Sequence, residues 1–352
     1  MKVVLLGLSI TSSWGNGHAT NYRALVRELA ARDHDVLFLE RDRPWYAAHR
    51  DLAEPPWGRT CLYGSLDALR LRFCGDVRAA DLVIVGSYVP EGAAVGEWVT
   101  STASGLAAFY DIDTPVTLAD LARGRCEYLS PGLIGRYDLY LSFTGGPTLD
   151  RLEHDYGARR AIAFHCLVDP DAYFPQYVEP RWDLGYLGTY SADRQPQVDE
   201  LLLEPARAAP RCRFAAAGPQ YPSDVVWPPN VERLEHVPPA DHARFYAAQR
   251  WTLNVTRADM RAAGWSPSVR LFEAAACGVP VISDRWDGLD ELFADGTEIV
   301  MADSAMDVLR ALHEIPDDER RAIGSRARRR VLAAHTAGRR VDQLEELAGV
   351  TV

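Results

Sequence analysis

The sequence predicts an α/β protein built from two doubly wound parallel sheets, one in each half of the chain. Short apolar runs alternate with helical stretches up to residue 164, and a second such series begins at Leu184. Repeated β-α-β units of this kind are typical of doubly wound sheets. The segment between them, residues 167–175, is rich in Asp and Pro, which indicates a linker. We therefore expect a first domain at residues 1–166 and a second at residues 167–330.

The first series contains apolar runs that we expect to form buried strands. They lie at residues 3–8, 35–40, 82–86, 109–115 (where the strand runs into a loop), 139–143 and 161–164. After the first of them comes a polar, Gly-rich loop. The amphipathic helix expected at residues 20–32 follows, with Leu25, Val26 and Leu29 on one face.

The second series repeats the pattern. Its expected strands lie at residues 184–188, 214–217, 231–234, 251–255, 279–283 and 299–301. The basic, amphipathic stretch from residue 317 to residue 347 is expected to be helical.

The composition is that of a globular protein with an acidic balance. The 352 residues are 47% hydrophobic and 25% charged, and 49 acidic residues outnumber 38 Lys and Arg residues. The net charge of −11 disfavours nucleic acids and anionic membranes as partners of the whole chain. We interpret the Arg-rich run at residues 326–330 as a solvated helix face.

The cysteine pattern favours a reducing compartment. Six cysteines are scattered along the chain, without a C-x-x-C pair or a His cluster at zinc spacing. This argues against a disulfide framework or a structural metal. The first apolar run is too short to span a membrane and lacks the flanks of a signal peptide. We therefore expect a cytoplasmic protein with no integral membrane segment.

The segment at residues 267–283 carries the strongest functional signal. It reads as a polar loop, an Ala-rich helix, a Gly-Pro break and a buried strand. The first turn of such a helix offers unpaired N–H groups and partial positive charge, and Arg270 adds a charged fork, so a diphosphate would suit it. Glu273 is placed one turn further to accept hydrogen bonds from sugar hydroxyls. Because many helix-to-strand connections share part of this pattern, the short run alone leaves a purely structural role open.

Two further arginines follow predicted strands of the second domain. Arg194 comes after the strand at residues 184–188, and Arg257 after the strand at residues 251–255. With Arg270, they form the arrangement needed to hold two phosphates and to stabilise the charge that develops on a leaving group.

The loop after the first strand is a second candidate region. At Gly15 and Gly17 the missing Cβ atoms would let the backbone approach a phosphate or a sugar, although a simple tight turn is also open. His18 is a candidate general base or sugar ligand, unless it only caps the helix. A dinucleotide-binding G-x-G-x-x-G would need a third glycine at position 20, which is Thr20, so a dehydrogenase fits poorly.

Residues 267–293 resemble the donor-site signature of glycosyltransferases of the GT-B fold, especially the group-1 or family-4 class. Those proteins carry a similar E-A-x-A-x-G-x-P-V-V run, here starting at Glu273, followed by a Gly-rich turn and x-E-L. The closest likeness is to the spore-maturation-protein-like subgroup, where Arg-x-Phe-Glu leads into the helix. The resemblance implies two Rossmann-like domains facing a central cleft, with a last helix at about residues 331–352 packing back on the first.

The resemblance also implies roles for residues of the donor site. In the matching loop of the family, a Lys or Arg neutralises the donor diphosphate, here Arg194 with Thr189 and Tyr190 as helpers; an exposed arginine beside an aspartate is the structural alternative. Ser268 and Val269 match positions whose backbone amides face the diphosphate.

Three acidic positions of the family pattern remain. Glu273 matches the glutamate expected on the ribose, and Glu291 matches one in the turn after the strand. The other glutamate of the common Glu-x7-Glu pair is replaced by Trp265, which bears on the donor sugar and on the assumption of retained anomeric configuration.

Asp111 and Asp113 form a D-x-D sequence, a metal motif of the other glycosyltransferase fold. In a GT-B protein we interpret these acids as structural or acceptor-binding, with Asp113 as a candidate base, and we expect no metal and no resident cofactor.

The sequence thus predicts a metal-independent, retaining hexosyltransferase-type enzyme. Its donor would be a nucleoside diphosphate sugar, with UDP favoured, and its acceptor a small molecule, a glycan or a protein. Two alternatives stay open: a nucleotide-sugar epimerase or phosphorylase of the same fold, and a non-catalytic sugar-nucleotide-binding assembly protein.

Overall fold

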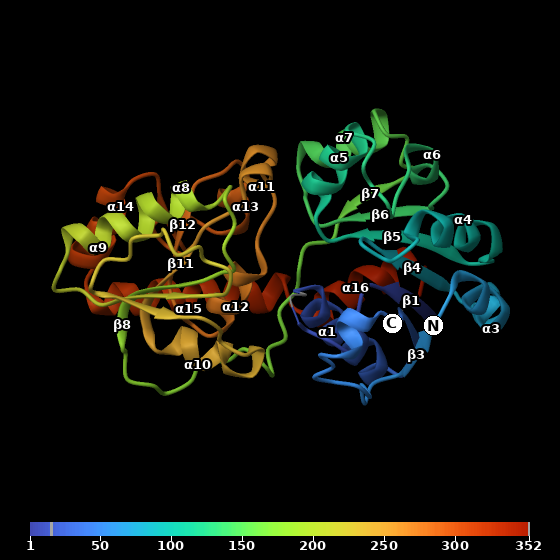
Figure 1. The fold of residues 1–352 in the computed structure, drawn as a ribbon, viewed down its shortest axis with the longest axis horizontal. Coiled ribbons are helices and arrows are strands. Elements are labelled where there is room, and N and C mark those ends of the chain that lie inside the picture. The colour runs from blue at the N-terminus through green and yellow to red at the C-terminus, as the bar shows by residue number, and fades with distance from the viewer. Residues whose placement is uncertain (15–16, 351–352) are drawn as a thin grey trace. The chain divides into compact units, whose positions relative to one another are not determined.

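The structure, a computed structural model, describes residues 1–14 and 17–350 and divides the chain into two compact units (Figure 1). Unit 1 consists of Met1–Leu167 together with the segment that starts at Ala337, and unit 2 is Val168–Thr336. The sequence placed the boundary one residue earlier, and it placed the start of the returning segment at about residue 331. Each unit contains one sheet of its own.

Unit 1 has a parallel sheet of seven strands in the order β3-β2-β1-β4-β5-β6-β7. The order reverses next to β1, which is the switch point where doubly wound sheets bind ligands. Residues 3–6 of β1 are all apolar and fully buried, as expected of a strand covered on both faces. The strands are β1 (Lys2–Gly7), β2 (Asp35–Arg41), β3 (Arg59–Tyr63), β4 (Leu82–Gly86), β5 (Leu106–Asp111), β6 (Leu139–Ser142) and β7 (Ala161–Ala163).

Helices connect these strands, and the C-terminal helix joins them. Figure 1 shows α16 beside α1, and Arg32 at the end of α1 lies 2.8 Å from both Asp342 and Glu345 of α16. The helices of unit 1 are α1 (His18–Ala31), α2 (Pro44–Ala47), α3 (Leu66–Ala79), α4 (Gly92–Thr102), α5 (Thr114–Ala122), α6 (Pro131–Ile134), α7 (Pro147–His154) and α16 (Ala337–Leu347).

Unit 2 has a parallel sheet of six strands in the order β10-β9-β8-β11-β12-β13. Because β8 and β11 are neighbours in this sheet, the loops that leave their carboxyl ends start side by side. The strands are β8 (Trp182–Leu187), β9 (Phe214–Ala217), β10 (Val231–Leu234), β11 (Gln249–Asn254), β12 (Val281–Asp284) and β13 (Val300–Ala302).

The helical segments of unit 2 include a π-helical turn between α8 and α9, and α12 lies against α15. They are α8 (Gln195–Val198), the π-helix Asp199–Leu203, α9 (Glu204–Ala208), the 3-10 helix Pro239–Asp241, α10 (His242–Ala247), α11 (Ala258–Ala263), α12 (Val269–Ala276), α13 (Leu289–Leu292), α14 (Ala305–Glu314) and α15 (Asp317–Ala334).

The predicted α/β class with two doubly wound sheets is confirmed, and each strand expected from the sequence lies within a few residues of an observed one. One observed strand, β3, was not predicted from the sequence. It is an edge strand with one buried residue, and its sequence contains no apolar run. No helix within residues 1–14 and 17–350 combines the length and the apolar character needed to cross a bilayer.

Candidate active site

Arg270 lies at the carboxyl ends of the two central strands of unit 2. It is the second residue of α12 and is only 8% exposed. Its Nε donates to the carbonyl of Leu187, the last residue of β8, at 2.5 Å, and its Nη1 donates to Asn254 Oδ1 at the end of β11 at 2.7 Å. The guanidinium also lies 5.1 Å from the ring centre of Tyr186. The side chain is therefore held in one orientation by both strands.

Arg194 lies close enough to Arg257 and Arg270 for their positive charges to affect its own ionisation. Burial lowers the pKa of Arg194, and the charges of Arg270 and Arg257 lower it further. Arg194 donates to the Thr189 carbonyl at 3.1 Å, and the half-exposed Arg257 lies 3.8 Å from Asp193. The sequence-predicted arginines are thus brought together, and a cluster of like charges is stabilised by an anion such as a diphosphate.

The start of α12 faces the same strand ends. Ser268, the N-cap residue, donates its hydroxyl to Asn254 Oδ1 at 2.7 Å and does not cap the helix. The amides of the first turn, from Ser268 and Val269 onward, therefore receive no hydrogen bond from that side chain. Asn254 therefore accepts hydrogen bonds from both Ser268 and Arg270. It was not predicted as a site residue, because its only sequence signal is its place at the end of a strand.

Glu273 lies on the same helix but contacts a different element. It is 5% exposed, and its Oε2 accepts a hydrogen bond of 3.0 Å from the hydroxyl of Tyr246 on α10. Burial raises the pKa of Tyr246, and the charge of Glu273 raises it further, so the phenol remains a donor. Tyr246 was missed from the sequence, because nothing in its local pattern marks it as the partner of a carboxylate.

The remaining donor-loop candidates differ in exposure. Thr189 is exposed, whereas the half-buried Tyr190 packs edge-to-face against Tyr221 at 5.5 Å. Glu291 is exposed on α13.

Trp265 occupies the position where the family pattern has a glutamate. Its backbone φ of 44° is left-handed, and its amide donates to the Asp287 carbonyl at 2.7 Å. A Cβ added to Gly288 would overlap the indole ring, so the ring packs directly on that glycine. The tryptophan thus closes the turn before α13.

In unit 1, the structure brings His18 and Asp113 together. His18 begins α1 after β1, and Asp113 is the N-cap residue of α5 after β5. His18 Nε2 lies 3.8 Å from Asp113 Oδ2, and the hydroxyl of Tyr88, which follows β4, donates to the same oxygen at 3.1 Å. The Tyr88 ring packs edge-on to His18, with centroids 5.3 Å apart. Such an imidazole–carboxylate pair can bind or deprotonate a hydroxyl group.

The two aspartates of the D-x-D sequence have separate surroundings. Asp111 is fully buried and accepts hydrogen bonds from Thr117 Oγ1 at 2.7 Å and from the Tyr140 hydroxyl at 2.6 Å. Burial raises its pKa to about 6. Asp111 therefore braces the end of β5, and Asp113 is the more accessible acid. Among residues 1–14 and 17–350, no three His, Cys, Asp or Glu side chains gather in a metal-binding group.

Of the two glycines expected to approach the ligand, Gly15 and Gly17, the structure describes Gly17. Gly17 is exposed as the N-cap residue of α1, and a Cβ added there would meet no atom within 4 Å. Gly15 lies outside the described residues.

The comparisons with known proteins agree with this geometry. Residues 194–346, which include the three clustered arginines and α12, match the family described as glycosyl transferase-like. Among curated proteins, none matches the sequence.

Solved structures share the fold over the whole chain at low sequence identity. Sucrose-phosphate synthase from Thermosynechococcus elongatus is 15% identical with a TM-score of 0.70, and the match covers 98% of this chain and 97% of that one. HepE of Anabaena, in complex with UDP and glucose, is 14% identical with a TM-score of 0.72 and 100% coverage of both chains. An alpha-glucosyltransferase in complex with UDP-glucose and DNA containing an abasic site is 11% identical with a TM-score of 0.68, covering 99% of this chain and 98% of that one. These likenesses confirm the predicted GT-B fold.

Proposed function

We propose that this chain is a glycosyltransferase that moves a hexosyl group from a nucleoside diphosphate sugar to a hydroxyl group of its acceptor. The observation that carries the proposal is the cluster of Arg194, Arg257 and Arg270 at the carboxyl ends of β8 and β11. Positive charge fixed in advance at this place would stabilise a departing diphosphate as the glycosidic bond breaks.

Each donor-site residue has a defined part in the proposal. Arg270 and Arg194 bind the diphosphate, and the amides of Ser268 and Val269 add the partial positive charge of the helix start. Glu273 accepts hydrogen bonds from the ribose while Tyr246 holds its other oxygen. Because the arginines already neutralise the phosphates, the reaction proceeds without a metal ion.

Unit 1 supplies the groups for the acceptor and the transferred sugar. His18, held by Asp113, binds or deprotonates a reacting hydroxyl, and the backbone near Gly17 approaches the sugar. Retention of the anomeric configuration belongs to the proposal because the chain resembles a retaining class.

UDP is the favoured nucleotide because HepE and the alpha-glucosyltransferase were each solved with UDP or UDP-glucose. The net charge of −11 favours an acceptor other than a nucleic acid, although that glucosyltransferase was solved with DNA. We place the reaction in a reducing compartment such as the cytoplasm, because the six cysteines are scattered along the sequence and often lie in apolar runs, as buried thiols do.

One observation favours a second candidate function. Trp265 packs on Gly288 where the family pattern has a donor-contacting glutamate. A protein that binds sugar nucleotides without transferring the sugar would tolerate this replacement.

Nucleotide binding is tested first by thermal shift with UDP, GDP, dTDP, CDP and NAD. A ligand at about 100 times its Kd adds about 2.7 kcal/mol of stability, which is readily detected. Stabilisation by one nucleoside diphosphate but not by NAD is expected, and no response to any of them would contradict the donor site.

Transfer is tested next with the matching nucleotide sugar and acceptor mixtures. Release of the diphosphate together with a new glycoside is expected, and the NMR coupling constant of its anomeric proton reports retention or inversion. Diphosphate binding without any glycoside would instead support the non-catalytic alternative.

A further inference from the structure

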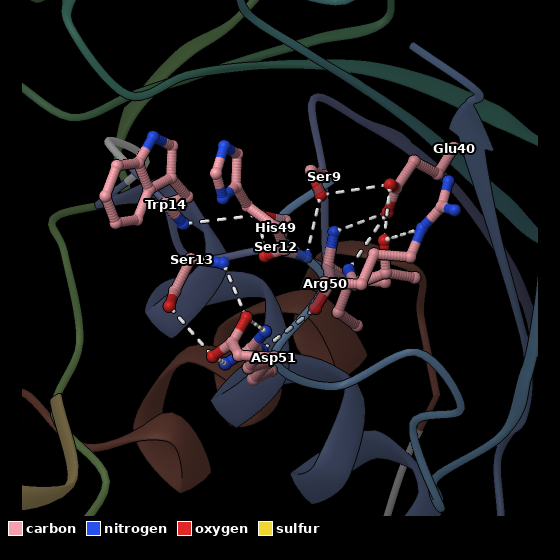
Figure 2. Close-up of polar contacts among 11 residues, drawn as sticks. Ser9, Ser12, Ser13, Trp14, Glu40, His49, Arg50 and Asp51 are labelled. Atoms are coloured by element: carbon pink, nitrogen blue, oxygen red, sulfur yellow. Dashed lines mark hydrogen bonds and ion pairs between the residues drawn. The ribbon is translucent and has the colours of Figure 1, made fainter. Parts of the chain in front are cut away.

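Two exposed tryptophans flank a histidine on the surface of unit 1. Trp14, in the segment between β1 and α1, is 48% exposed, and Trp45 of α2 is 63% exposed. The Trp14 and His49 rings are stacked, with centroids 4.5 Å apart and planes 15° from parallel (Figure 2). Trp45 meets His49 edge-on at 6.2 Å. We call these three rings the aromatic platform.

A buried carboxylate holds the loop that leads to Trp14. Glu40, fully buried at the end of β2, accepts hydrogen bonds from Ser9 Oγ at 3.0 Å and from the Ile10 amide at 2.8 Å. It also accepts from the amide and the hydroxyl of Thr11, at 3.0 and 2.6 Å. One side chain therefore fixes three consecutive residues of the loop.

A second set of contacts joins this loop to the segment that carries His49. Asp51 accepts from the amide and the hydroxyl of Ser13, both at 2.8 Å (Figure 2). It also forms a two-bond ion pair with Arg23. Ser12 Oγ donates to the His49 carbonyl at 2.8 Å and accepts from the Trp14 amide at 3.3 Å. Ser12 thus contacts the backbone of both stacked residues, Trp14 and His49.

Large aromatic rings that a protein holds in place yet leaves in water mark binding surfaces, because burying them in the fold would have been favourable. A carboxylate with a half-exposed side chain, Asp42, lies in the same segment, where Arg50 contacts one of its two oxygens. Aromatic faces attract the polarised C–H groups of a pyranose, and carboxylate oxygens accept hydrogen bonds from its hydroxyls. We propose that the aromatic platform binds a saccharide and, because Trp14 precedes His18 by only four residues, that this saccharide is part of a glycan acceptor of the proposed transferase.

Charge distinguishes this ligand from an anionic membrane. Residues 40–54, which carry Trp45 and His49, contain three arginines and four acidic residues, and Arg23 is paired with Asp51, so this segment brings no surplus positive charge to the platform. Binding to anionic lipid headgroups depends on such a surplus.

The test measures saccharide binding without nucleotide, so it does not depend on the donor site. Maltotriose, cellotriose, chitotriose and mannotriose are titrated against the full chain, with saturation-transfer NMR and calorimetry as readouts. At least one trisaccharide is expected to bind, and Trp14→Ala or Trp45→Ala to weaken it about tenfold, which is a typical effect of removing one aromatic contact. Trp45→Phe should retain binding within about threefold, since it keeps an aromatic face.

Tyr177→Ala is the matched control, because this fully exposed aromatic lies in unit 2, and it should leave saccharide binding unchanged. Equal affinity for wild type and both Trp→Ala variants, or no binding of any of the four sugars, would overturn the proposal. So would binding to phosphatidylglycerol vesicles that depends on Trp14 and Trp45 while no sugar binds. The inference rests on the proposed function only for naming the acceptor: saccharide binding without any nucleoside diphosphate binding would refute the transferase and leave the platform standing.

Discussion

The imidazole of His18 lies 3.8 Å from the carboxylate of Asp113, although the two residues are far apart in the sequence. They meet because β1, β4 and β5 are consecutive in the sheet, so the segments after these parallel strands emerge at one edge. Tyr88, from the segment after β4, donates to the same carboxylate oxygen. Segments after three neighbouring strands thus place His18 and Asp113 next to each other, and each of the two side chains orients the other.

Replacing either His18 or Asp113 should slow sugar transfer without lowering the affinity for the nucleotide. His18→Ala is expected to lower kcat by about 10²–10⁴-fold, the usual range for a lost general base, and Asp113→Asn by less, because the imidazole remains. Single-turnover transfer measures the rate, and calorimetry measures the Kd of UDP. Tyr88→Phe keeps the ring edge against His18 and removes only the hydrogen bond to Asp113, so it should lower kcat less than either of the other two variants. An equal loss of UDP affinity would show that His18 belongs to the donor site.

The fold was predictable because its strands are buried on both faces and leave continuous apolar runs, as in β1 and β4. The half-exposed edge strand β3 leaves no such run. In the candidate site, the order of the strands brings Arg194, Arg257 and Arg270 to the carboxyl edge of one sheet. This grouping was predictable, because each arginine lies in a segment that follows a predicted strand.

Side-chain partners were not predictable in the same way. The contacts of Tyr246 with Glu273, and of Asn254 with Arg270, depend on how α10 and α12 pack. Burial of Asp111 likewise follows from the three-dimensional packing, since D-x-D reads the same in an exposed loop.

Replacing Arg270 should distinguish phosphate binding from base or ribose binding. Arg270→Ala is expected to weaken UDP by about 2–3 kcal/mol, the cost of a lost charge-assisted hydrogen bond, and to leave uridine nearly unaffected. Arg270→Lys keeps the charge but cannot reach both the Leu187 carbonyl and Asn254, so it should recover only part of the affinity. Titration calorimetry with both ligands gives the comparison. Equal losses for UDP and uridine would contradict the phosphate role.

Replacing Glu273 should give the opposite pattern. Glu273→Ala is expected to weaken UDP and uridine alike, by roughly 1–3 kcal/mol, because the lost hydrogen bonds are to the ribose. Wild type should also prefer UDP over 2′,3′-dideoxy-UDP, and the variant should lose that preference. Tyr246→Phe is the matched control, since it removes the hydroxyl that holds Glu273 but keeps the carboxylate. A preference that survives in Glu273→Ala would place the ribose elsewhere.

The buried carboxyl of Asp111 should make the free energy of unfolding depend on pH. Burial raises its pKa from 3.8 to about 6, so between these values the folded chain keeps a proton that the unfolded chain releases. The unfolding free energy contributed by Asp111 is therefore fully present below pH 3.8 and falls as pH rises to about 6, by about 3 kcal/mol. Urea unfolding of wild type and Asp111→Asn between about pH 4 and pH 7 measures it.

The comparison with Asp111→Asn is needed because other groups have the opposite effect. Burial lowers the pKa of His165 to about 4, so its contribution falls as pH drops below 6.5. That contribution is common to both proteins and cancels in their difference. The stability of wild type relative to Asp111→Asn should therefore fall as pH rises from about 4 to about 6 and then stay level. A difference that stays constant over this range would mean that Asp111 is already ionised in the folded protein.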